Sequence, residues 1–141
     1  PVLKARMREV IGGVQDKPLL IGGRSMGGRV ATMLAADGFA CDGLLLFAYP
    51  LHPPGQPGKL RAEHLPKITV PVLCLNGTRD PLCTRELMDG VVKGLTALWT
   101  MHWLEGADHS FRVLKRSGRT DREVTEEVGA AIDKWVRSYP F

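Results

Sequence analysis

A serine flanked by glycines is the feature of this sequence that most directly indicates chemistry. Residues 23–27 read Gly-Arg-Ser-Met-Gly and match the pattern G-x-S-x-G. They lie between an apolar run that predicts a strand and a pattern that predicts a helix. A serine hydroxyl is a weak nucleophile until a base takes its proton, and a tight strand-to-helix turn exposes Oγ at the carboxyl edge of a sheet. We therefore predict that Ser25 is a nucleophile.

The same turn predicts how a developing negative charge would be stabilised. The backbone N–H of Met26 and the N-terminus of the following helix point toward the oxyanion of an attacked acyl group. The alternative for residues 22–28 is a phosphate-binding turn, but neither the G-K-[ST] ending nor G-x-G-x-x-G is present. Arg24 has two open roles, which are attraction of a substrate carboxylate and an ordinary surface position.

An acid and a base follow at the ends of later predicted strands. Enzymes with this serine motif carry their catalytic residues in the order serine, acid, histidine. Asp80 lies in the loop 76–81 that directly follows the apolar run 71–75, and His109 follows the alternating run 98–104. The alternative for Asp80 is that it only starts a turn or caps the next helix. The order and the strand ends favour a triad of Ser25, Asp80 and His109.

The remaining histidines fit the role of base less well. His102 lies inside a predicted strand, His64 in a short polar helical stretch and His52 in a proline-rich loop, so we expect each to be packed or solvated. Asp108 is a poor alternative acid, because a side chain adjacent to His109 is badly placed to orient its imidazole.

The proposed roles give a complete reaction. His109 takes the Ser25 proton during attack on an acyl carbon and returns it to the leaving group, while Asp80 holds the imidazole tautomer. Water then hydrolyses the acyl-enzyme. This chemistry requires no metal and no organic cofactor.

Helices and strands are predicted to alternate along the chain. Alternation implies a parallel sheet with helices on both faces, so we expect an α/β fold in a three-layer α/β/α sandwich and one domain over residues 1–141. The expected helices cover residues 3–14, 26–36, 84–93 and, after a Thr120–Glu123 capping box, a final segment that includes Val124, Val128, Ile132 and Trp135; the expected strands cover residues 18–21, 43–48, 71–75 and 98–104.

Composition narrows the class of protein. The 141 residues carry a net charge of +4 spread along the chain, which is typical of a solvated surface and not of a nucleic-acid-binding face. No apolar run approaches the roughly 18 residues of a membrane span. Cys41, Cys74 and Cys83 lack metal or redox spacing, and no leader pattern opens the chain, so we expect reduced thiols in a cytoplasmic protein.

Four segments carry a resemblance to a known family. They are G-G-R-S-M-G-G-R-V-A at residues 22–31, Y-P-L-H-P-P-G at 49–55, L-N-G-T-R-D-P at 75–81 and G-A-D-H-S-F at 106–111. The chain resembles the dienelactone-hydrolase-like α/β-hydrolases, within a branch that also includes a scaffold subunit of the NSL chromatin complex. The resemblance implies that the loop 49–55 borders the substrate pocket, which adds Tyr49 to Met26 and Arg24 as oxyanion or substrate residues.

The chain also departs from that family. Such hydrolases usually have about eight strands, and the loop after their third strand donates the second oxyanion N–H. The opening helix here resembles the one before the nucleophile strand, so we expect the C-terminal half of the fold, without that donor. The strand at Leu19 would be an uncovered edge, and we predict self-association through it unless the chain is a fragment of a longer protein.

Two functions remain open on the sequence. The first is a carboxylesterase-like hydrolase that acts on a small soluble ester or related acyl substrate. The second is an inactive hydrolase-like interaction module or fragment, which the missing half of the fold and the scaffold relative suggest. No nucleic acid or membrane partner is expected.

Overall fold

The computed structural model describes residues 2–11, 18–96 and 98–141. Its centre is a parallel sheet whose strands lie side by side in chain order, β1 to β4. Because all strands run in one direction, their carboxyl ends meet at one edge of the sheet. The strands are β1 (Leu20–Arg24), β2 (Gly43–Phe47), β3 (Val72–Gly77) and β4 (Trp99–Leu104).

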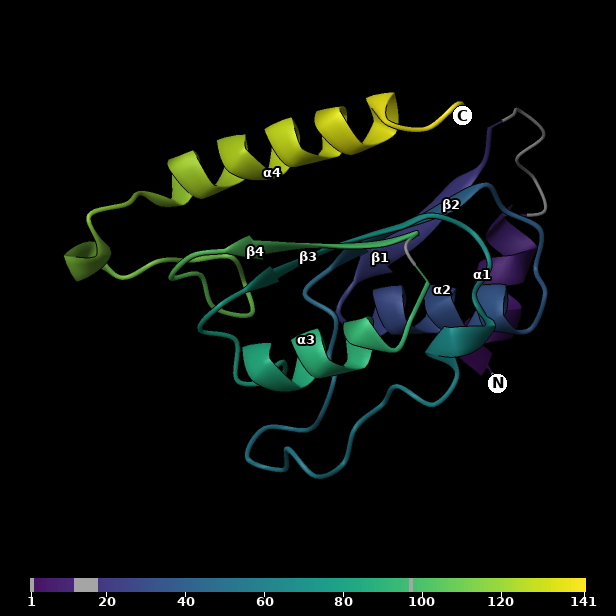
Figure 1. The fold of residues 1–141 in the computed structure, drawn as a ribbon, viewed down its shortest axis with the longest axis horizontal. Helices are drawn as coiled ribbons and strands as arrows, with labels where there is room; N and C mark the ends of the chain where they lie inside the picture. The colour runs from purple at the N-terminus through teal and green to yellow at the C-terminus, as the bar shows by residue number, and fades with distance from the viewer. Residues whose placement is uncertain (1, 12–17, 97) are drawn as a thin grey trace.

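Helices cover both faces of this sheet (Figure 1). Of the α-helices in the described part of the chain, three lie on one face, and α4 (Asp121–Arg137) lies on the other. Right-handed connections between successive parallel strands place the connecting segments on one face, whereas the segment after β4 crosses to the opposite face. The three are α1 (Val2–Ile11), α2 (Met26–Ala36) and α3 (Arg85–Lys93). The predicted α/β/α sandwich with a parallel sheet is confirmed.

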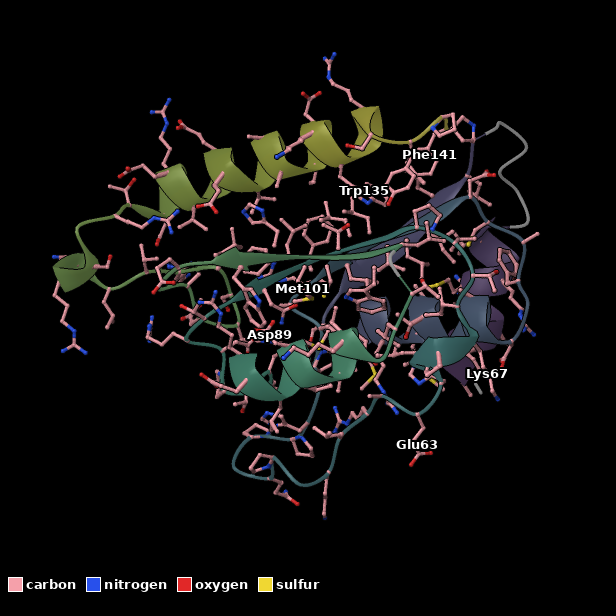
Figure 2. The ribbon with its side chains drawn as sticks, viewed as in Figure 1. Glu63, Lys67, Asp89, Met101, Trp135 and Phe141 are labelled. Atoms are coloured by element: carbon pink, nitrogen blue, oxygen red, sulfur yellow. The ribbon has the colours of Figure 1, made fainter. Side chains whose placement is uncertain are left out.

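The sheet separates two apolar clusters. Leu44, Leu46 and Cys74 pack toward α2 and α3, whereas Leu73 and Leu75 pack toward α4. All six residues of β3 are buried, as expected for a central strand covered on both faces. In Figure 2 the side chains of Trp135 and Phe141 lie between α4 and the sheet, and Met101 lies on the face of α3.

Sequence patterns located the elements and missed some of their ends. The helix predicted over 26–36 is observed with those bounds. The first strand begins and ends later than predicted, because its pairing with β2 continues through Gly22, Gly23 and Arg24. The first helix ends at Ile11 in its described part, and the predicted residue Val14 lies outside the described residues.

The short polar helical stretch and the capping box predicted from the sequence are both present. The stretch before Pro71 is a single 3-10 turn, η1 (Leu65–Lys67), closed by backbone bonds from Lys67 to His64 and from Ile68 to Leu65. Thr84 precedes α3, but its hydroxyl bonds His52 and leaves the helix amides uncapped. The capping box of Thr120 is present, with Glu123 as its partner. Among the described residues, none of the helices has the length and apolarity needed to cross a bilayer.

Candidate active site

Ser25 occupies a strained turn between β1 and α2. Its backbone has φ 50° and ψ −119°, in a region that residues with a side chain rarely adopt. The Ser25 N–H donates to the Phe47 carbonyl at 2.8 Å, and the Ser25 carbonyl accepts from the Arg29 N–H at 3.0 Å. These bonds hold the turn to the neighbouring strand and to the first turn of the helix.

Glycines allow the strand and the helix to approach closely at this turn. An added Cβ at Gly23 would lie 2.7 Å from the Gly27 carbonyl carbon, and one at Gly28 would lie 2.7 Å from the Gly23 carbonyl oxygen. At Gly27 a Cβ would meet no atom of the described residues within 4 Å. The close packing therefore depends on Gly23 and Gly28, and the second glycine of the G-x-S-x-G motif is not required for space.

Asp80 lies in the loop that follows β3 and points into the protein. Its side chain is fully buried, and its Oδ1 accepts the Leu82 N–H at 2.8 Å. Cys83 lies in the same turn, where burial, with the Asp80 carboxylate nearby, raises the pKa of its thiol to about 12. Cys83 is therefore neutral near pH 7 and does not compete as a nucleophile.

His109 joins the serine and the aspartate. Its Nε2 lies 2.9 Å from Ser25 Oγ, and its Nδ1 lies 2.7 Å from Asp80 Oδ2. Because the carboxylate only accepts, Nδ1 carries the proton and Nε2 accepts from the serine hydroxyl. The structure thus brings the three predicted residues into one hydrogen-bonded chain, from segments 29 and 84 residues apart along the sequence.

The N-terminus of α2 begins directly at this site. The first backbone bond of the helix is from the Arg29 N–H to Ser25, so the amides of Met26, Gly27 and Gly28 precede it and remain available to a ligand. Met26 is 43% exposed. Beside it lies an apolar depression of about 440 Å³, lined by Leu3, Arg6, Met7, Val10, Met26, Gly27 and Val30.

Arg24 is exposed at the surface, which is one of the two roles that the sequence left open, whereas Tyr49 does not lie where the sequence placed it. Arg24 donates from Nη2 to the His109 carbonyl at 3.0 Å. Its guanidinium therefore contacts the loop after β4 that carries His109, residues 105–113, which is called the histidine loop below. Tyr49 is fully buried and donates its hydroxyl to the Arg61 carbonyl at 2.6 Å. Burial raises the pKa of Tyr49 to about 12. The expectation that Tyr49 lies beside the substrate is therefore wrong. Tyr49 is a core residue that fixes the loop between β2 and β3.

Two polar residues that sequence reasoning did not assign to the site support its loops. Asn76 accepts the Tyr49 N–H and donates to the Tyr49 carbonyl, which fixes the turn after β2. His52 is packed in the interior, which is one of the two outcomes expected for it. Its ring Nε2 accepts the Thr84 N–H at 3.1 Å, and its backbone N–H donates to the Leu82 carbonyl. His52 thereby holds the loop of Asp80. The sequence feature that could have indicated this role is the position of His52 in the segment 49–55, which resembles the family.

The histidine loop is shaped by Asp108 and Arg79. Asp108 Oδ1 accepts the N–H groups of Ser110 and Arg112, both at 2.9 Å. Burial opposes the ionised form of Asp108, but these bonds outweigh it and lower its pKa. Arg79 donates to the carbonyls of Gly106 and Arg112. Asp108 therefore shapes the turn around His109, and Asp80 is the carboxylate that contacts the ring.

The remaining histidines pair elsewhere. His64 contacts the Thr32 hydroxyl at 2.7 Å, and burial, with Arg29 nearby, lowers its pKa. His102 contacts Glu127 on α4 at 2.6 Å. Within the described part of the chain, no cluster of three His, Cys, Asp or Glu side chains could hold a metal ion.

A serine on a strained strand-to-helix turn, bonded to a histidine and then to a buried aspartate, is the arrangement of one large enzyme superfamily. The sequence pattern of an α/β-hydrolase domain family matches residues 1–137. This chain belongs to the α/β-hydrolases.

Solved α/β-hydrolase structures share the fold of this chain. An esterase from Pyrococcus furiosus is 14% identical, with a TM-score of 0.73 over 98% of this chain and 61% of its own. A putative α/β-hydrolase of unknown function from Agrobacterium tumefaciens is 21% identical, with a TM-score of 0.68 over 94% of this chain and 58% of its own. A serine hydrolase homologue from Coxiella burnetii is 21% identical, with a TM-score of 0.58 over 76% and 48%. This α/β-hydrolase chain spans about half to two thirds of their length.

Proposed function

We propose that this α/β-hydrolase chain carries the serine–histidine–aspartate machinery of a carboxylesterase-like acyl hydrolase. The observation that supports it most strongly is the continuous chain of hydrogen bonds, 2.9 Å from Ser25 to His109 and 2.7 Å from His109 to Asp80. The strained backbone of Ser25 supports it independently, because such strain is typical of residues held for function.

The proposed reaction begins with the serine. Ser25 Oγ attacks the acyl carbon as its proton passes to His109 Nε2, and the carbonyl oxygen becomes an oxyanion near the Met26 N–H. His109 then gives the proton to the leaving alkoxide, which departs as an alcohol. Water enters and attacks the acyl-enzyme as His109 takes one of its protons. The bond between the acyl carbon and Ser25 Oγ then breaks, His109 returns the proton to Oγ, and the acid is released.

Asp80 prepares the histidine for both transfers. Its Oδ2 accepts a hydrogen bond from the Nδ1–H of His109 and stabilises the positive charge that the ring carries between the two proton transfers. Its Oδ1 is held by the Leu82 amide, so the carboxylate is oriented before a substrate binds. Pre-orientation of this kind lowers the cost of reaching the transition state.

The substrate that we propose is a small ester or related acyl compound. Structural neighbours described as esterases, from Pyrococcus furiosus and Rhodothermus marinus, share the fold and support this class. We also propose that the chain belongs to the dienelactone-hydrolase-like branch, on the four sequence segments that resemble it.

A fluorophosphonate probe tests the proposal, because it reacts with activated serines of this kind. We expect the wild-type chain to be labelled and Ser25→Ala to lose labelling completely. Ser138→Ala is the matched control, since that hydroxyl lies at the end of α4 and donates to the Lys134 carbonyl. Absence of labelling in the wild type would reject the hydrolase and favour the interaction module.

A further inference from the structure

Arg24 extends from β1 to the loop that carries His109. It is the last residue of β1 and immediately precedes Ser25. Its Nη2 donates to the His109 carbonyl at 3.0 Å, and its guanidinium carbon lies 4.6 Å from the centre of the Phe111 ring. The guanidinium therefore has a hydrogen-bond acceptor and an aromatic face, both supplied by the histidine loop.

The Phe111 ring is a fixed platform for this contact. Phe111 has φ 62°, and its N–H donates to the Asp108 carbonyl at 3.0 Å. Its ring packs at 6.5 Å from Phe47, which is the register partner of Arg24 in β2. Arg24, Phe111 and Phe47 therefore form one packed group that ties the loop to the ends of β1 and β2. A non-glycine residue keeps a positive φ only where its surroundings hold it.

The opposite side of the loop is held in a similar way. Arg79 immediately precedes Asp80, and it donates to the Gly106 carbonyl at 3.1 Å and to the Arg112 carbonyl at 3.4 Å. The residue before the proposed nucleophile and the residue before the proposed acid are thus both arginines that bind carbonyls of the same loop. His109 lies between them and contacts Ser25 and Asp80 through its ring.

We infer that Arg24 is a positioning residue for the proposed base, and not a binding site for a substrate carboxylate. It fixes the His109 backbone at the distance from β1 at which Nε2 reaches Ser25 Oγ. A guanidinium bound to a carbonyl and stacked on a ring is pre-organised, and a lysine does not reproduce both contacts. This inference rests on the proposed hydrolase function for its kinetic consequence, but its structural consequence can be measured without activity.

The kinetic test compares Arg24→Gln and Arg24→Lys with a matched control, Arg122→Gln. Arg122 is an exposed arginine of α4 paired with Glu126. The substrates are p-nitrophenyl acetate, which is neutral, and the mono-p-nitrophenyl ester of glutaric acid, which carries a carboxylate.

We expect Arg24→Gln to lower kcat about ten- to a hundredfold on both esters, with KM changed by less than about twofold, because a misplaced base slows the chemical step. Arg24→Lys should recover part of the rate, because an ammonium still donates to the carbonyl. A loss confined to KM of the anionic ester would show that Arg24 binds the substrate and would overturn the inference. Activity of Arg24→Gln equal to that of Arg122→Gln would overturn it too.

Hydrogen exchange separates this inference from the proposed function. In Arg24→Gln we expect faster deuterium uptake in residues 105–113 than in Arg122→Gln, with uptake over β3 unchanged. If the wild type fails to react with fluorophosphonate while this uptake still rises, the proposed function fails and the positioning contact stands. If uptake in the loop is unchanged, the contact does not hold the loop and the inference fails, whatever the labelling shows.

Discussion

Ser25 illustrates how a single residue can be held away from its preferred conformation. A positive φ in a residue with a side chain costs on the order of 1–3 kcal/mol, so other contacts must offset it. The bonds of Ser25 to Phe47 and Arg29, and the close approach of Gly23 to Gly28, supply them. The serine hydroxyl is thus oriented by the backbone of two elements before any substrate binds.

The two glycines after Ser25 should respond differently to the same substitution. Gly27→Ala adds a Cβ that meets no atom within 4 Å, in a helix where alanine is favoured by up to about 1 kcal/mol, so we expect unchanged or slightly raised stability. Gly28→Ala places its Cβ 2.7 Å from the Gly23 carbonyl oxygen, and we expect a loss of about 1–3 kcal/mol. Urea unfolding of both variants measures the difference.

Gly27→Ala is itself the control for helix propensity, since the two positions are adjacent in α2. Equal stabilities of the two variants would mean that the strand and the helix do not meet as closely as described. In that case the strained turn would need another support.

At the level of elements, the chain order alone was enough to predict the proposed triad. Parallel strands bring their carboxyl ends to one edge, so residues that follow β1, β3 and β4 had to lie near one another. Contacts between side chains were beyond such reasoning. The Arg61 carbonyl accepts from the buried Tyr49 hydroxyl and Asn76 binds the Tyr49 backbone, whereas Arg24 contacts the ring of Phe111, a residue with positive φ. None of these partners is a sequence neighbour, and no periodic pattern encodes them.

The attachment of α4 to β4 should depend on pH through Glu127. This carboxylate accepts from His102 on β4 and from Arg119. Burial would raise its pKa, but the bonds from His102 and Arg119 outweigh burial and hold the pKa below the ordinary 4.5. A depressed pKa in the folded state means that the stabilisation is complete above about pH 4.5 and is lost as the pH falls further.

We therefore expect Glu127→Gln to be less stable than the wild type at pH 5.5, with the gap narrowing as the pH falls from 4.5 to 3. Thermal unfolding followed by circular dichroism over this range measures the gap. Glu126→Gln is the matched control, because Glu126 is more exposed and, among the described residues, pairs only with Arg122 one helical turn away. A gap that stays constant down to pH 3 would show that Glu127 contributes no charge-dependent stability.

For the whole molecule, the sheet has two edge strands among the described residues, β1 and β4, and an apolar surface is exposed on α1. Among the described residues β1 pairs only with β2, so its other edge presents backbone groups to solvent. On α1, which packs against α2, Leu3 is 56% and Val10 63% exposed, next to the 43% exposed Met26. Similar solved α/β-hydrolases are longer than this chain, which covers 58% of the Agrobacterium structure and 61% of the Pyrococcus one.

We propose that the 141-residue chain self-associates through this edge and the apolar surface of α1. Sedimentation velocity should show a weight-average mass that rises with protein concentration. Val10→Glu, which places a charge on the exposed surface, should shift the distribution toward the monomer, whereas Arg116→Glu, in the distant turn before α4, should not. A single monomeric species of the wild-type chain at every concentration would contradict the proposal, because an open strand edge and an exposed apolar surface would then coexist without association.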